Sequence, residues 1–274
     1  MIVDALKVLK IVMDNPFSRN LLQMGLKNCK DCRMREIEHA LAIFAGQDIP
    51  HTISCHVYSL MVSSILRISG ATFNVDFERL RSYFKDPIVR RGVTSVLSGI
   101  GRYGVTKPQY LDAPFLIVWN YTNACNLRCK HCYQRADKPG PNELTTKERL
   151  KVVGELAEAG VVSIAFSGGE PLMRRDFYKV ATEVRKRGIY IALATNGTFI
   201  TRRIARKLKK CGVDYIEVSL DAATPRIHDD FRGIAGTFEK TLNGVKNCVE
   251  EGFFTCVATA VTKLNLAEIP RLIE

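Results

Sequence analysis

The stretch FLIVWNYTNACNLRCKHCYQ, residues 115–134, joins a short apolar run to a loop that carries three cysteines. Residues 115–120 are of strand type, because they form a short run of mostly apolar side chains that includes β-branched and aromatic residues. Cys125, Cys129 and Cys132 follow within eight residues, so one short loop can wrap all three thiols around a single object. The stretch therefore predicts a strand followed directly by a loop with metal or redox chemistry.

The residues downstream alternate between apolar runs and helical patterns. Strands are predicted at 162–166, 189–194, 214–220 and 253–260, with helices at 145–160, 176–187, 201–212 and 237–251 and a last one beginning at Asn265. The strands are apolar almost throughout, which is typical of parallel strands covered on both faces. Such βα units close into barrels or form open doubly wound sheets, and in both the loops after the strands make the active face.

The residues upstream follow a helical rhythm instead. Candidate helices cover 3–13, 16–27, 35–45, 54–69, 76–85 and 88–99, with Pro16 and Pro87 at first-turn positions. The stretch 99–114 contains three glycines and two prolines and indicates a linker, which we place at 106–113. We therefore predict an all-helical domain over 1–105 and an α/β core over 114–274.

Composition narrows the class of protein. The 274 residues carry 40 Lys and Arg against 28 Asp and Glu, a net charge of +12 that is spread along the chain. The densest basic run lies at 202–210, where helical spacing favours a solvated face over a nucleic-acid groove. No apolar stretch reaches the roughly 18 residues of a membrane span, and the charged N-terminus does not resemble a signal peptide. We expect a cytoplasmic protein, although the charge also permits contact with a membrane surface.

The three-cysteine loop favours an iron–sulfur cluster. Cubane clusters normally take four thiolates, one for each iron, so three cysteines leave one iron open, as in a catalytic metal site. Arg128, Lys130 and His131 would offset the negative charge of such a cluster. Two alternatives stay open: a zinc site completed by His131, and surface thiols without a metal.

A second metal site is a further candidate. Cys29 and Cys32 form a chelating pair in the helical region, and zinc or rubredoxin-like iron bound there would staple a small domain. Further ligands available nearby are His39, His51, Cys55 and His56.

The cysteine spacing, C-x3-C-x2-C followed by the aromatic Tyr133, resembles the radical S-adenosylmethionine (AdoMet) superfamily, which carries this motif after the first strand of a βα series. Ser167-Gly168-Gly169-Glu170-Pro171, after the second strand, resembles the GGEP motif that contacts the methionyl amino group of AdoMet in that family. Physically, two glycines permit close backbone approach, and a carboxylate can accept a hydrogen bond from an ammonium group.

Three further segments resemble one branch of the family, which carries additional iron–sulfur chemistry and includes the molybdenum-cofactor cyclase, the pyrroloquinoline quinone maturase and haem-modifying enzymes. They are Thr195-Asn196-Gly197, Ser219-Leu220-Asp221 and Phe231-Arg232-Gly233, the last followed by Gly236-Thr237-Phe238. The resemblance implies that Ser219 and Arg232 hold the AdoMet carboxylate and that Asn196 lines the pocket. Ala222 departs from the pattern, since it replaces a glycine expected at a tight turn.

The resemblance implies a partial (β/α)6 barrel, of which five strands are present, preceded by the all-α domain. Because a sixth strand and the branch's cysteine-rich extension are not visible, we expect a fragment or the product of a split gene.

The implied activity is that of a radical AdoMet enzyme. A [4Fe–4S] cluster held by Cys125, Cys129 and Cys132 would receive an electron from a flavodoxin or ferredoxin type of donor. The cluster would then cleave AdoMet to a 5′-deoxyadenosyl radical, which abstracts hydrogen from a peptide, tetrapyrrole, nucleotide or isoprenoid lipid. No protein acid or base is needed for that step, so we assign none. Asp221 and His228 are candidates for substrate contact.

Two other classes of function remain as alternatives. The first is a non-catalytic iron–sulfur electron carrier or scaffold, which would explain the cysteines but not the GGEP, TNG and SLD segments. The second is a basic, zinc-stapled nucleic-acid-binding module, which would explain the charge, although nucleic acid is not the expected partner.

Overall fold

The computed structural model describes residues 10–11, 13–27, 34–49, 52–72 and 76–274. The chain divides into two units, one of residues 1–115 with 159–162 and the other of residues 116–158 with 163–274. Among the described residues, no helix is long and apolar enough to cross a membrane.

The described part of the first unit is helical. Its helices are α2 (Pro16–Met24), α3 (Glu36–Phe44), α4 (Ile53–Thr72), α5 (Phe77–Phe84) and α6 (Pro87–Tyr103). Helix α6 begins as its sequence predicts, because the side chain of Asp86 accepts from the backbone N–H of Ile88 and Pro87 occupies the first turn. The predicted helix over 3–13 lies mostly outside the described residues.

The stretch 99–114 is not all linker, because α6 continues through Tyr103. The linker that we place at 106–113 begins after this helix and stays a prediction. Gly99 and Gly101 lie inside this helix, where a Cβ at Gly99 would stand 2.1 Å from the carbonyl oxygen of Tyr110. These glycines therefore allow close packing along the helix and do not mark a flexible segment.

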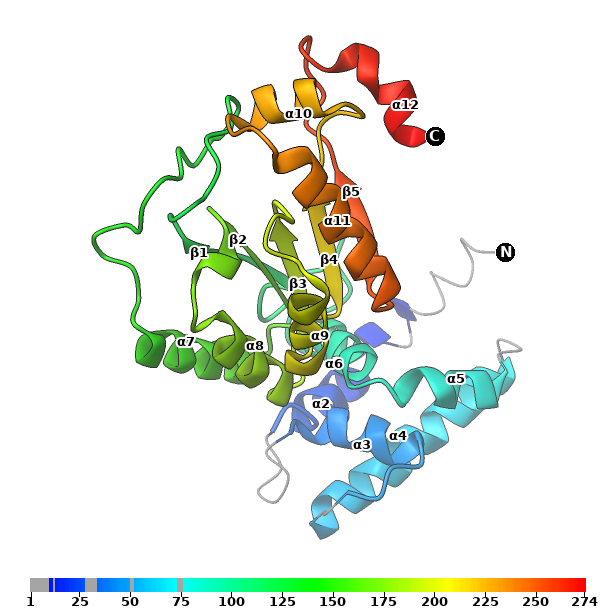
Figure 1. Cartoon of the computed structure of the whole chain (residues 1–274). Coiled ribbons are helices and arrows are strands. Elements are labelled where there is room, and N and C mark those ends of the chain that lie inside the picture. Colours follow the sequence, from blue (N-terminus) through cyan, green and yellow to red (C-terminus); the bar gives the residue numbers. More distant parts are fainter. Residues whose placement is uncertain (1–9, 12, 28–33, 50–51, 73–75) are drawn as a thin grey trace. The chain divides into compact units, whose positions relative to one another are not determined.

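The second unit is built on one parallel sheet (Figure 1). Its five strands, β1 (Leu116–Thr122), β2 (Ser163–Gly168), β3 (Tyr190–Thr195), β4 (Tyr215–Ser219) and β5 (Phe254–Ala258), pair in the order of the sequence. Between them run α7 (Thr146–Ala159), η1 (Pro171–Met173), α8 (Phe177–Lys186), α9 (Arg202–Cys211), α10 (Pro225–Arg232) and α11 (Thr237–Glu250), and η2 (Leu266–Glu268) and α12 (Ile269–Ile273) follow β5. The fold is the predicted α/β class, a five-stranded part of a TIM-like barrel.

The two faces of the sheet differ in burial. Ile164, Phe166, Ile191 and Leu193 are fully buried on one face, whereas the alternate residues of β3 and β4 are only partly buried. The second face includes Ala192, Ala194, Glu217 and Ser219. The apolar strands suggested cover on both faces, but the side chains at these four positions of the second face are small or polar.

The ends of α7 and α9 are set by capping residues that are close in sequence. At α7, Thr145 and Glu148 form the predicted capping box: the backbone N–H of Thr145 donates to the Glu148 carboxylate at 2.7 Å, and the reciprocal bond measures 3.3 Å. Thr201 caps α9, which ends at Gly212 with φ of 89°.

Candidate functional site

The three cysteines lie on one loop, residues 123–137, which we call the cysteine loop. Its two ends are joined at a neck, where Cys125 N–H donates to the Asp137 carbonyl at 3.2 Å and Asp137 N–H donates to the Asn123 carbonyl at 3.0 Å. Arg128 and Asp137 add an ion pair across the loop. The loop is thus closed before any ligand binds.

The thiols of Cys125, Cys129 and Cys132 are half-buried and form no disulfide. Cys125 Sγ accepts from the backbone N–H of Leu127 at 3.4 Å, and Cys129 Sγ accepts from Arg232 Nη1 at 3.7 Å. Burial raises the pKa of both thiols, and Arg232 opposes that rise at Cys129. These N–H donors would stabilise the thiolate form once a metal displaces the protons.

This donor set fits an iron–sulfur cubane. Within the described residues, no three His, Cys, Asp or Glu side chains form a group of the kind that holds one metal ion. A cubane makes a different demand, because each thiolate binds its own iron. The ring of His131 stacks on Phe231, with centroids 4.5 Å apart.

The two glycines after β2 pack against the neck of the cysteine loop. A Cβ at Gly168, where φ is 109°, would stand 2.6 Å from the Thr122 carbonyl oxygen, and a Cβ at Gly169 would stand 2.2 Å from that of Ala124. Instead, Gly169 N–H donates to Thr122 at 2.7 Å and Glu170 N–H donates to Ala124 at 2.8 Å. Close backbone approach was expected here, and in the structure the approaching backbone is that of the cysteine loop.

Glu170 joins the second and third strand-end loops. Its side chain is fully buried and accepts from Thr195 Oγ1 at 2.9 Å, from Asn196 N–H at 2.8 Å and from Leu172 N–H at 3.1 Å. Burial raises its pKa to about 7, although these hydrogen bonds pull the other way. The carboxylate therefore shapes the loops, and its predicted contact with AdoMet stays a prediction.

Asn196 connects the third loop to the cysteine loop. Its Nδ2 donates to Asn126 Oδ1 at 2.8 Å, and its Oδ1 accepts from the Thr198 hydroxyl at 2.7 Å. Three of the strand-end loops are thereby tied into one hydrogen-bonded layer, through Ala124, Glu170 and Asn196.

Helix α10 holds the other side of the cysteine loop. The N–H groups of Arg128 and Lys130 donate to the carbonyls of Arg232 and Phe231, both at 3.0 Å. Lys130 Nζ also lies 2.7 Å from the Asp230 carboxylate. The C-terminal end of α10 therefore lies directly against the tip of the loop.

Arg232, at this end of α10, is 7% exposed and stands between the loop and the fourth strand end. Its Nε lies 2.6 Å from Asp221 Oδ2, and Asp221 is itself fully buried. The guanidinium is thus held by one carboxylate while it donates to Cys129 Sγ. Ser219, at the end of β4, is partly buried.

Two expectations about this region are wrong. Asp221 and His228 were candidates for substrate contact, but both are fully buried. Asp221 Oδ1 accepts from Ala260 N–H at 2.9 Å, and His228 Nδ1 accepts from Asp221 N–H at 3.2 Å. Ala222, which made the turn doubtful, is fully buried, and its φ is not positive, so the turn forms without a glycine.

Other predicted residues stand apart from this layer. The Tyr133 side chain is 81% exposed. Cys29, Cys32 and His51 lie outside the described residues, so a second metal site stays a prediction.

Sequence reasoning missed helix α10 and the partners of Arg232. The Thr224-Pro225 pair is an N-cap followed by a first-turn proline, and it was the available signal for α10.

A closed loop of three thiols at the C-terminal edge of a parallel βα sheet defines a class of iron–sulfur proteins built on a TIM-like barrel. Comparison with known families identifies which: the model of the radical SAM superfamily matches residues 119–274. The chain belongs to the radical SAM superfamily, whose members use a [4Fe–4S] cluster and AdoMet.

The chain is also similar in sequence to proteins of known name. Over 164 residues the chain is 42% identical to the Fe-coproporphyrin III synthase of Methanosarcina barkeri, a match that covers 60% of this chain and 41% of that protein. It is 32% identical over 160 residues to the mycofactocin maturase MftC of Mycobacterium tuberculosis, covering 58% and 41%. The chain thus spans less than half the length of these two relatives.

Among solved structures, SuiB of Streptococcus suis bound to S-adenosylmethionine matches with a TM-score of 0.58 and 17% identity, over 86% of this chain and 52% of that one. This likeness supports the fold.

Proposed function

We propose that Cys125, Cys129 and Cys132 hold a [4Fe–4S] cluster and that the chain acts as the AdoMet-cleaving part of a radical SAM enzyme. The observation that carries the proposal is the closed cysteine loop, whose neck packs against the two-glycine loop and whose half-buried Cys129 thiol accepts from Arg232. The bound cluster supplies the electron that splits AdoMet into methionine and a 5′-deoxyadenosyl radical.

The protein's own residues would bind and orient AdoMet. Arg232 would hold its carboxylate, since the guanidinium is the cation beside Cys129. Ser219 would add a hydroxyl from the end of β4, and the backbone of Gly168 and Gly169 would present carbonyls to the methionyl ammonium. Asn196 and Glu170 would fix the shape of these loops, and Tyr133 would cover the exposed side.

For the substrate we propose a tetrapyrrole, because the relative at 42% identity is named for coproporphyrin chemistry. A peptide is the second candidate, since the mycofactocin maturase is also similar. The electron would come from a low-potential flavodoxin or ferredoxin. We place the protein in the cytoplasm, where cysteine thiols stay reduced.

The test is anaerobic reconstitution of the chain with iron and sulfide. We expect iron and sulfide to bind in equal amounts, and the electron paramagnetic resonance (EPR) spectrum of the reduced protein to change when AdoMet is added. Cys125→Ala should abolish both, whereas Cys256→Ala, at an exposed cysteine of β5, should leave both unchanged. With dithionite and AdoMet, 5′-deoxyadenosine should form, and iron-containing tetrapyrroles tested as substrates should increase its yield more than a peptide does.

A spectrum that AdoMet leaves unaltered would contradict the proposal and favour an electron carrier or scaffold.

A further inference from the structure

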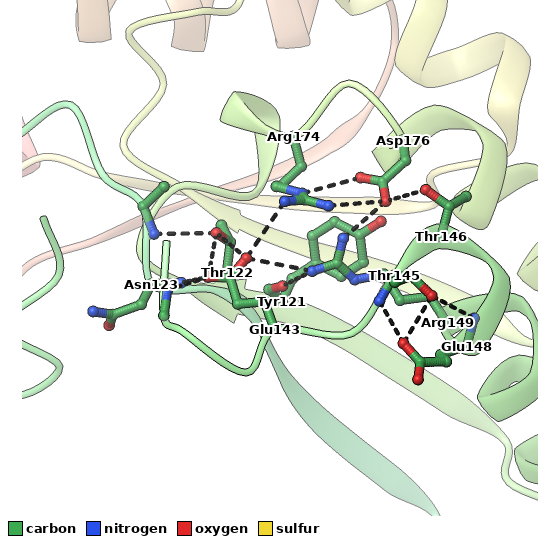
Figure 2. Close-up of polar contacts among 12 residues, drawn as sticks. Tyr121, Thr122, Asn123, Glu143, Thr145, Thr146, Glu148, Arg149, Arg174 and Asp176 are labelled. Atoms are coloured by element: carbon green, nitrogen blue, oxygen red, sulfur yellow. Dashed lines mark hydrogen bonds and ion pairs between the residues drawn. The ribbon is translucent and has the colours of Figure 1, made fainter. Parts of the chain in front are cut away.

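Glu143 stands at the neck of the cysteine loop, outside every motif identified in the sequence. Its Oε1 accepts three hydrogen bonds: from Thr122 Oγ1 at 2.8 Å, from Asn123 N–H at 2.7 Å and from Gly140 N–H at 3.0 Å (Figure 2). One carboxylate oxygen thereby joins the end of β1, the first residue of the loop and the segment that follows the loop.

Two arginines hold this carboxylate from the opposite side. Arg149 Nη2 lies 3.6 Å and Arg174 Nη1 lies 3.5 Å from Glu143 Oε2. The side chain of Arg149 is 1% exposed, and its Nη2 also donates to the Tyr121 carbonyl at 2.9 Å. Both guanidinium groups bind Asp176 as well, at 2.8 Å from Arg149 and 3.3 Å from Arg174 (Figure 2).

The network is electrically balanced, with two carboxylates and two guanidinium groups. Burial raises the pKa of Glu143, but the hydrogen bonds from Asn123, Thr122 and Gly140 outweigh it and leave the pKa below its ordinary value. Asp176 shifts the same way, to about 2, because bonds from Arg174, Thr146 and Arg149 outweigh its burial. Both carboxylates are therefore ionised at neutral pH, and the buried Arg149 depends on them for compensation.

From these contacts we infer that Glu143 is a positioning residue for the cluster: it fixes the neck of the cysteine loop so that the three thiols stay at the spacing a cubane requires. The inference rests on the proposed function. The loop closes on itself through two backbone bonds at Asn123, Cys125 and Asp137, and Glu143 sets the backbone on which that closure depends. Removing a group that hydrogen-bonds to a metal ligand typically changes metal affinity about 10–100-fold. Glu143 bonds to the backbone two residues before Cys125, so we expect the lower end of that range.

The variants are chosen to separate charge, hydrogen bonding and general stability. Glu143→Gln keeps the size but removes the charge facing Arg149, and Glu143→Asp keeps the charge on a shorter side chain. Thr122→Val removes one donor to Glu143 and, with it, the acceptor of the Ala124 N–H, but it creates no buried charge. Glu148→Gln is the matched control, since Glu148 lies close by in α7 but bonds to Thr145 of the capping box and not to the loop.

The measurement is the rate at which anaerobically reconstituted protein loses iron to a chelator, together with the EPR line shape of the reduced cluster and the melting temperature. We expect Glu143→Gln to lose iron about tenfold faster than wild type and to broaden the spectrum. Thr122→Val should show the same changes to a smaller extent. Glu143→Asp should lose iron faster than wild type but more slowly than Glu143→Gln. Glu148→Gln should lower the melting temperature slightly with wild-type iron loss.

Wild-type iron loss and spectrum in Glu143→Gln would overturn the inference while the proposed function stands. If that variant does not fold, Thr122→Val decides, and iron loss equal to that of Glu148→Gln would overturn the inference. Wild-type protein that takes up no cluster would instead contradict the proposed function.

Discussion

Glu170 is a buried acidic side chain that accepts hydrogen bonds from its own loop and from the loop after β3. It accepts from three donors in a fully buried position, so the carboxyl group lies inside the fold whether or not it is protonated. Because its pKa in the folded protein is about 7 and its ordinary value is 4.5, the folded state binds this proton more tightly than the unfolded chain does.

Glu170 should therefore make stability depend on pH. Its contribution is fully present below about pH 4.5 and is lost as the pH rises to about 7, since ionisation is easier in the unfolded chain. Between pH 5 and pH 8, wild type should lose about 2–3 kcal/mol relative to Glu170→Gln, measured by urea unfolding. The variant itself should be less stable at both values, because one amide oxygen cannot accept from all three donors. Parallel pH profiles for the two proteins would refute the raised pKa.

Individual residues were predictable where their partners are close in sequence. Cys125, Cys129 and Cys132 share one loop, so spacing alone brought them together. Arg149 and Asp176 lie 27 positions apart, and Asp221 meets Arg232 only after α10 folds back on the loop. Such pairs carry no local pattern, so charge in the sequence could not distinguish a buried network from a solvated surface.

Among the helices and strands, α10 is an element that the hydrophobic pattern of the sequence does not predict. The strands were predicted to within a few residues at each end, because apolar runs between glycines are strong signals. Helix α10 has eight residues, PRIHDDFR, mostly polar, so no apolar periodicity marks it. Its position comes instead from backbone contacts with the cysteine loop.

The end of α10 offers a matched pair of glycines. Gly233 and Gly236 have φ of 74° and 76°, so alanine at either position pays a similar backbone cost of about 1–2 kcal/mol. A Cβ at Gly233 would stand 2.2 Å from the Arg128 carbonyl oxygen, whereas at Gly236 nothing lies within 4 Å. Gly233→Ala should therefore lower the free energy of unfolding by at least about 1 kcal/mol more than Gly236→Ala.

The same two variants also test whether α10 constrains the cysteine loop. Gly233→Ala should also speed iron loss from the reconstituted protein, because the Arg128 backbone must move. Equal effects of the two alanines on stability and iron loss would show that α10 does not constrain the cysteine loop.

For the whole molecule, the net charge of +12 is not concentrated in one part of the chain. Along α9, Arg202 pairs with Glu250 at 3.0 Å and Arg206 with Glu251 at 3.8 Å, while Lys207 lies 3.6 Å from the centroid of the Tyr178 ring. The densest basic run is thus partly engaged with the protein's own side chains. This favours the solvated face over a phosphate-binding groove.

Nucleic-acid binding should accordingly be weak and respond little to salt. A groove that contacts 6–10 phosphates loses about 10³–10⁵-fold in affinity between 50 and 200 mM salt. We expect less than about a tenfold change for labelled duplex DNA and single-stranded RNA, measured by fluorescence anisotropy. A steep salt dependence would revive the nucleic-acid-binding alternative.

The attachment of the cysteine loop to α10 has a consequence for the order of events during synthesis. Cys129 and its partner Arg232 are 103 positions apart, so a ribosome releases all three thiols well before their far-side support exists. A nascent chain ending before α10 would offer the thiols on a loop that is closed at its neck but unsupported at its tip. Insertion of the cluster should therefore follow the synthesis of residue 233. Before that point, cellular iron–sulfur carriers would meet an incomplete binding site.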